Sequence, residues 1–141
     1  MSELNGQIRN FFQQYERANA EFDVQKIAAL YGDVFMFAGP QGVQAVKKDD
    51  FVKILPKRKE FFKAAGLTSS RVASVEATAL DSKYTLAKVA WKMRIERTGA
   101  TPVEIDAFAT YVLSVNADSL QIIFQIDHQD LMQKARELGP K

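Results

Sequence analysis

Hydrophobic positions along this chain follow two different spacings, and the change comes near residue 66. Before it, apolar residues recur every three or four positions, which predicts amphipathic helices. The longest such stripe lies in residues 4–22 and consists of Leu4, Ile8, Phe11, Phe12, Tyr15, Ala18 and Phe22. After it, apolar and polar residues alternate, which predicts β-strands. This order favours an α+β architecture in which early helices cover one face of a later antiparallel sheet.

A short helix and a short strand are expected next. Asp23 is a suitable N-cap for a helix of about two turns, and Gly32 should end it. Residues 34–38 are apolar and predict a strand. Residues 39–42, Gly-Pro-Gln-Gly, predict a turn.

A third helix is predicted between residues 49 and 66. Asp49 or Asp50 can serve as its N-cap. Pro56 should kink or restart the helix, and Gly66 suits its C-terminal end. The segment is rich in basic residues, namely Lys47, Lys48, Lys53, Lys57, Arg58, Lys59 and Lys63. Such a cluster can attract an anionic ligand or an acidic partner, but acidic neighbours dilute it and a solvated helix face is the favoured interpretation.

Four long strands are predicted across residues 68–128, with turns at 81–83, 98–102 and 117–118. The predicted cross-strand partners are Val75 with Val89, Ala73 with Trp91, Trp91 with Ala109, Met93 with Ala107, Tyr111 with Phe124, and Ala107 with His128. If the strands are regular, the inner face consists of Ala73, Val75, Val89, Trp91, Met93, Ile105, Ala107, Ala109, Tyr111, Ile122, Phe124, Ile126 and His128. Large rings beside alanines predict either an interlocked core or a cavity. The other face is polar except for a patch of Phe108, Val112 and Ile123, which is typical of a partner surface.

Three features of the chain are characteristic in combination. Residues 29–37, Ala-Leu-Tyr-Gly-Asp-Val-Phe-Met-Phe, lead into the turn at 39–42, and helices precede a long-stranded meander. The chain ends with Asp-His-Gln-Asp-Leu at 127–131 and Leu-Gly at 138–139. Together these features resemble the NTF2-like superfamily, and within it the SnoaL-like and ketosteroid-isomerase-like small proteins.

The resemblance implies a cystatin/NTF2-like cone, in which N-terminal helices pack on a curved antiparallel sheet and a short helix follows at the C-terminus. It also implies an internal pocket and commonly a homodimer built on the outer sheet face. Function does not follow, because this fold hosts many activities. Ketosteroid isomerases place their general-base aspartate directly before the strand-ending proline. Here Gly39 precedes Pro40, which argues against steroid isomerase activity even though Tyr15 can match the family's oxyanion tyrosine.

Composition limits the class of protein. The 141 residues fit one domain (residues 1–141), and a net charge of +2 does not suggest nucleic-acid binding. There is no cysteine, no signal-peptide pattern and no apolar run long enough to span a membrane. We therefore expect a soluble, cytoplasmic protein without a nucleic-acid or membrane partner. No nucleotide-binding, zinc-protease or serine-hydrolase motif is present, and no metal or other cofactor is expected.

Candidate chemistry centres on one histidine and several rings. His128 is the only histidine and suits general acid–base work near neutral pH, with Tyr15 as a candidate hydrogen-bond donor. The plainer interpretation is a histidine bonded to backbone at a strand end. The candidate ligand-binding residues are Tyr15, Tyr31, Trp91, Met93, Tyr111, Phe124 and His128. The alternative for the rings is a filled core.

Three hypotheses about function remain open. The leading one is a domain that binds a small, largely apolar molecule between helices and sheet. The second is an enzyme of the isomerase, dehydratase or cyclase type that uses His128 as its acid–base group. The third is an interaction module that dimerises through the Phe108 patch.

Overall fold

The structure is a computed structural model that describes residues 2–116, 119–129 and 133. Its elements are, in chain order, α1 (Ser2–Glu21), α2 (Val24–Ala29), β1 (Tyr31–Gly39), β2 (Gly42–Lys47), α3 (Lys48–Ala64), β3 (Leu67–Ala79), β4 (Tyr84–Ile95), β5 (Val103–Asn116) and β6 (Ser119–Asp127). The predicted α+β class and helix-before-sheet order are confirmed. The predicted C-terminal helix lies outside the described residues.

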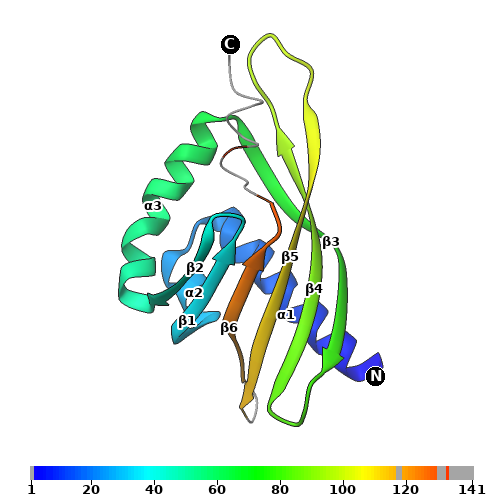
Figure 1. The fold of residues 1–141 in the computed structure, drawn as a ribbon. Helices are drawn as coiled ribbons and strands as arrows, with labels where there is room; N and C mark the ends of the chain where they lie inside the picture. The colour runs from blue at the N-terminus through cyan, green and yellow to red at the C-terminus, as the bar shows by residue number, and fades with distance from the viewer. Residues whose placement is uncertain (1, 117–118, 130–132, 134–141) are drawn as a thin grey trace.

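The six strands form one curved, open sheet in the order β2-β1-β6-β5-β4-β3. Strands β3 to β6 make the predicted antiparallel meander, whereas β1 pairs with β6 in parallel, which makes the sheet mixed. Figure 1 shows α1 lying across one face of the sheet and α3 standing beside the β1–β2 edge. These two helices therefore lie against different parts of the same sheet, one on a face and the other at an edge.

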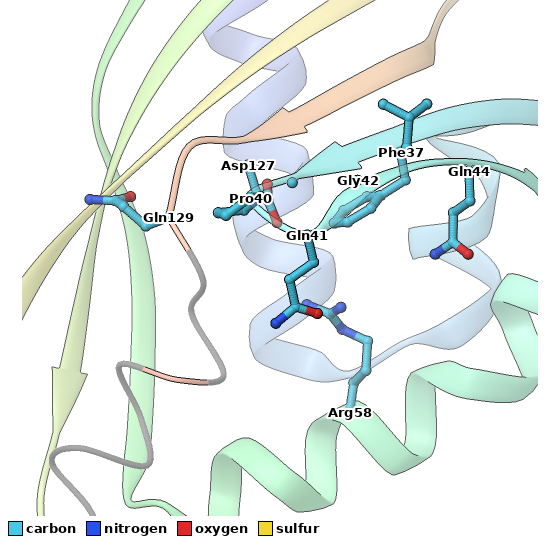
Figure 2. A pocket seen from close by; sticks show the side chains of 10 residues that line it. Phe37, Pro40, Gln41, Gly42, Gln44, Arg58, Asp127 and Gln129 are labelled. Carbon is cyan, nitrogen blue, oxygen red and sulfur yellow. The ribbon is translucent and has the colours of Figure 1, made fainter.

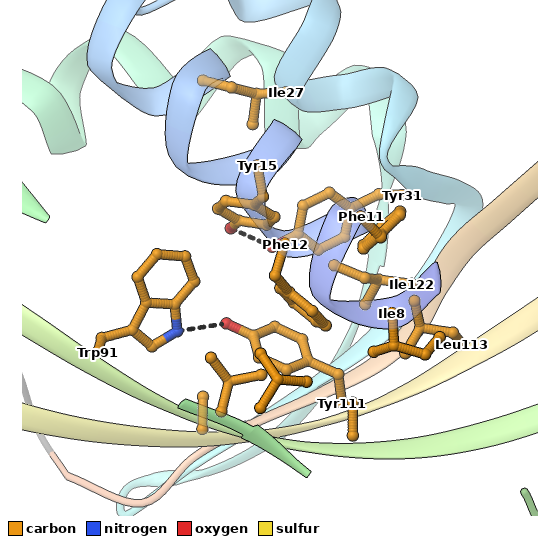
Figure 3. Close-up of a cluster of buried hydrophobic side chains, with 14 of the residues drawn as sticks. Ile8, Phe11, Phe12, Tyr15, Ile27, Tyr31, Trp91, Tyr111, Leu113 and Ile122 are labelled. Atoms are coloured by element: carbon orange, nitrogen blue, oxygen red, sulfur yellow. Dashed lines mark hydrogen bonds between the residues drawn. The ribbon is translucent and has the colours of Figure 1, made fainter. Parts of the chain in front are cut away.

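The apolar stripe of α1 builds the core against this inner face. Ile8 and Phe12 of α1 are fully buried, as are Leu113 of β5 and Ile122 of β6. The same cluster is seen in Figure 3, where the Phe12 ring lies over Tyr111 with their centres 4.7 Å apart. Burying these side chains stabilises the fold by roughly 1.5–3 kcal/mol each, so this packing fixes where α1 lies on the sheet.

Helix boundaries follow the sequence signals in part. Asp23 caps α2 as predicted, accepting a hydrogen bond from the Lys26 N–H at 3.1 Å. Neither Asp49 nor Asp50 caps α3, because the helix already begins at Lys48. Its N-cap is Lys47, which makes no side-chain capping bond. The two aspartates lie in the first turn instead, where a carboxylate is favoured by the helix dipole.

Helix α3 runs without a restart through Pro56 and ends before Gly66. Gly66 has a φ of +99°, and a Cβ there would lie 2.7 Å from the Glu96 carbonyl oxygen. Only glycine fits this position, as the sequence predicted.

Two irregularities alter the predicted pairing of the first three long strands. A bulge in β3 places Val72, not Ala73, opposite Trp91, so Ala73 is exposed. The β4–β5 pair is shifted by two residues, so Trp91 lies opposite Ala107 rather than Ala109. A shift of two keeps every side chain on its predicted face, whereas the bulge exchanges the faces. The predicted pair of Val75 with Val89 is present.

Candidate functional site

The site is determined by a bulge in β6. Leu113 of β5 pairs with Ile122, but the next residue, Val112, pairs with Phe124, so Ile123 has no partner on β5. An extra residue of this kind reverses the alternation of all residues that follow it. Gln125 and Asp127 consequently lie opposite Tyr111 and Ala109 on the inner face.

The prediction that His128 and Phe124 face the cavity is therefore wrong. His128 is exposed, and its Nε2 lies 2.7 Å from the Thr110 hydroxyl oxygen on the outer face. Phe124 and Ile126 face outward as well, beside Val112 and Thr110. The prediction failed because alternation assigns residues to faces only while the strand is regular, and the bulge at Ile123 interrupts β6.

A chain of hydrogen bonds holds the inward carboxylate. The Tyr31 hydroxyl donates to the Gln125 side-chain oxygen, and the Gln125 amide nitrogen donates to Asp127 Oδ1 at 3.0 Å. The hydroxyls of Tyr15 and Tyr31 are 2.6 Å apart (Figure 3). Because Tyr31 has one proton and gives it to Gln125, Tyr15 must be the donor in that pair. The hydrogen bonds in this series thus all run in one direction, from Tyr15 to Asp127.

Burial determines the protonation of these groups. It raises the pKa of Tyr15 to about 12 and raises the pKa of Tyr31 and of Tyr111 well above the ordinary tyrosine value, so all three remain neutral. Burial also raises the pKa of Asp127, although the Gln125 hydrogen bond and the charge of Arg58 oppose the shift. A carboxyl group with a raised pKa exchanges a proton closer to neutral pH than an ordinary aspartate does.

Asp127 lies on the wall between two pockets. The inner pocket has a volume of about 120 Å³ and is lined by Tyr15, Trp91, Met93, Tyr111 and Gln125, among others. The outer pocket has a volume of about 370 Å³ and lies between the β1–β2 turn and α3, with Phe37, Pro40 and Val43 on its walls. Arg58, Asp127 and Gln129 line both pockets. Figure 2 shows the Arg58 side chain extending from α3 toward Gln41 and Asp127.

The structure therefore gathers part of the predicted set. Tyr15, Trp91, Met93 and Tyr111 line the inner pocket, and Tyr31 lies behind them as the partner of Tyr15 and Gln125. The Trp91 indole N–H donates to the Tyr111 hydroxyl at 3.2 Å, which fixes both rings in the pocket wall.

Sequence reasoning missed the polar residues of the site, namely Arg58, Gln125, Asp127 and Gln129. One signal was present: Ile122, Ile123 and Phe124 are three apolar residues in a row, and such a run contradicts simple alternation. A bulge within this run explains why polar Gln125 and Asp127 follow on the inner face.

Comparison with known proteins identifies the family. The sequence profile of a family described as NTF2-like protein (DUF6841) matches residues 2–130. The chain belongs to this NTF2-like family. No curated protein matches the chain.

Several solved structures share the fold of this chain. Aln2 from a Streptomyces species has a TM-score of 0.76 at 14% identity and is covered over 98% of its length by 96% of this chain. An NTF2-like protein with a cystatin-like fold from Novosphingobium aromaticivorans has a TM-score of 0.73 at 12% identity, with 94% of this chain and 86% of that chain covered. A ketosteroid isomerase-like protein from Erwinia carotovora atroseptica has a TM-score of 0.66 at 16% identity, with 91% and 97% covered. At these identities the likeness establishes the NTF2-like, cystatin-like fold alone.

The described residues do not group in the ways that a metal site or a membrane-spanning helix requires. They contain no group of three or more His, Asp or Glu side chains placed to hold a metal ion. No helix among them is long and apolar enough to cross a bilayer.

Proposed function

We propose that this NTF2-like protein binds a small molecule whose apolar part enters the inner pocket and whose polar part lies at Asp127. The observation that supports this most is the position of Asp127, a half-buried carboxylate at the junction of two pockets with rings on one side and Arg58 on the other. Ligand sites commonly combine apolar walls with a few convergent polar groups in this way. The hydrogen-bond chain from Tyr15 supports the proposal further, because it keeps the carboxylate in one orientation.

A thermal-shift screen with a library of small ring-containing molecules tests this. A bound ligand raises the melting temperature by mass action. Ser70→Phe, whose side chain would fill the inner pocket from β3, should abolish the shift. Ser69→Phe, on the neighbouring exposed position, is the matched control and should keep it. The proposal is contradicted if no library member stabilises the unmodified chain, or if both variants keep the full shift.

A second candidate function is an enzyme of the isomerase, dehydratase or cyclase type with Asp127 as its acid–base group. The raised pKa of Asp127 favours this residue over His128, since a carboxyl that exchanges its proton closer to neutral pH suits proton transfer. On any substrate found, Asp127→Asn should lower the turnover by roughly 100-fold or more, whereas His128→Asn should leave it nearly unchanged. The reverse ranking would contradict this assignment.

Assembly as a homodimer through the outer sheet face stays part of the proposal. The Phe108 side chain is 49% exposed there, and the β6 bulge adds Phe124 and Ile126 to the same face as Val112. An apolar surface of this kind is typical of a partner interface. Phe108→Glu should halve the mass measured by light scattering while the chain stays folded, and an unchanged mass would contradict the dimer. A cytoplasmic location stays a prediction.

A further inference from the structure

Few of the pocket residues carry a charge. Of the described residues that line the two pockets, only Arg58 and Asp127 have side chains that can carry a charge in the neutral pH range, because burial keeps Tyr15 and Tyr111 protonated. The ligand's own charge is therefore selected chiefly by these two groups.

Arg58 has hydrogen-bonding capacity that the ion pairs of the described residues do not use. Its guanidinium carbon lies 5.7 Å from the centre of the Phe62 ring, and none of the ion pairs among the described residues includes Arg58. A guanidinium carries five N–H donors and keeps its charge at every physiological pH. The charge of Arg58 acts on Asp127 from a distance, but none of the ion pairs among the described residues joins the two. Among the described residues, the Arg58 cation at the outer pocket thus has no counter-charge within ion-pair distance.

One amide that lines both pockets beside Arg58, that of Gln129, already has other partners. Gln129 lines both pockets, but its side-chain oxygen accepts from the Phe108 N–H at 2.8 Å and its nitrogen donates to the Asp106 carbonyl at 3.2 Å. Its amide is therefore engaged with the backbone of β5.

The surrounding charge also favours an anion. Helix α3, which carries Arg58, has six basic and three acidic residues. A positive surface next to a concave site raises the local concentration of anionic ligands. The sequence alone made a solvated helix face the better interpretation of this cluster, and that interpretation holds for its exposed members such as Lys57. Arg58 is the half-buried member that reaches the pocket.

We infer that the ligand is a small organic monoanion, whose carboxylate group pairs with the Arg58 guanidinium while its ring or chain lies toward Trp91 and Met93. This inference rests on the proposed function and names the class of its ligand. The ring would lie in the inner pocket of about 120 Å³, and the carboxylate would lie at Arg58, where this pocket adjoins the outer pocket of about 370 Å³. Asp127 opposes such an anion only when it is ionised, and its burial favours the protonated form.

Matched acids and amides test the inference. The probes are phenylacetate, 3-phenylpropanoate and cyclohexylacetate, each beside its neutral primary amide, and binding to the full chain is measured by calorimetry. For at least one pair, the acid should bind about tenfold or more tightly than the amide, because hydrogen bonds between charged partners are roughly twice as strong as neutral ones. In Arg58→Gln this preference should vanish. In Lys57→Gln, which removes the same charge from an exposed neighbour on α3, it should persist.

Each outcome decides one question. If amides bind as tightly as acids in the unmodified chain, or if the preference survives in Arg58→Gln, the anionic class is wrong while small-molecule binding stands. If no member of any pair binds, the anionic class is overturned, and the thermal-shift library decides the proposed function separately. A circular-dichroism spectrum of Arg58→Gln that matches the unmodified chain ensures that lost preference is not lost folding.

Discussion

The inner face of the sheet has two ends that are built differently. At one end, Ile8, Phe12, Leu113 and Ile122 are fully buried and fill the space between α1 and the sheet. At the other end, beyond the bulge at Ile123, the same strands present hydrogen-bonded rings, polar side chains and two pockets. One strand, β6, contributes to both ends. The closed end therefore holds the fold together, whereas the bulge allows the open end to carry polar groups.

Truncating one large side chain to alanine at each end should therefore give the largest difference in the free energy of unfolding. Leu113→Ala at the closed end leaves a sealed cavity and should lower the free energy of unfolding by about 3 kcal/mol. Met93→Ala at the open end removes a half-buried side chain beside an existing pocket and should cost about 1 kcal/mol. Urea unfolding measures both values. Equal losses at the two ends would contradict the division.

Removing hydroxyls from the hydrogen-bond chain at the open end should lower stability by smaller amounts, which differ between the two tyrosines. Tyr31→Phe leaves both the Tyr15 hydroxyl and the Gln125 oxygen without their partner and should cost roughly 2 kcal/mol. Tyr15→Phe removes only the first donor of the chain and should cost about 1 kcal/mol, because Tyr31 can still donate to Gln125. If urea unfolding shows that Tyr15→Phe loses more stability than Tyr31→Phe, the assigned direction of the hydrogen-bond chain is wrong.

The smallest effect concerns the pH dependence of stability. The pKa of Asp127 is raised in the folded state by burial, so the folded chain holds this proton more tightly than the unfolded chain does. The resulting stabilisation is full below the unfolded-state pKa and is lost as pH rises through the folded-state pKa. Asp127→Asn does not ionise, so its stability relative to the unmodified chain should increase as pH rises from about 3 through the acid range, and then level off.

A control separates this effect from general charge removal. Asp33→Asn removes a carboxylate whose side chain is 99% exposed, and it should show no comparable rise. If the advantage of Asp127→Asn is flat or falls with pH, the carboxyl is not in the environment described.

Much of the fold could be predicted because packing imposes its period on the sequence. The stripe of α1 and the alternation in β4 and β5 exist because those elements bury one side. The strand β2 was missed, since it is an edge strand whose residues are mostly exposed and carry no such period. The two-residue shift between β4 and β5 was also invisible, because it changes partners without changing faces.

The site was less predictable for a different reason. Trp91 and Tyr111 could be placed on the inner face because β4 and β5 are regular where they pair. His128 was placed there by the same rule and is wrong, because one unpaired residue in β6 exchanges it with Asp127. Arg58 was hidden among lysines of similar charge, and only the packing of α3 beside the β1–β2 turn distinguishes it.

The site depends on the exchange of Asp127 and His128 between the two faces of the sheet, and the absence of cysteine from the chain allows a direct test. Asp127→Cys and His128→Cys each introduce a single thiol, which a bulky maleimide then labels under native conditions. We expect the thiol at 128 to react quickly, and the thiol at 127 to react fully only after unfolding. The opposite order of reactivity would place His128 inside the sheet and contradict the site described here.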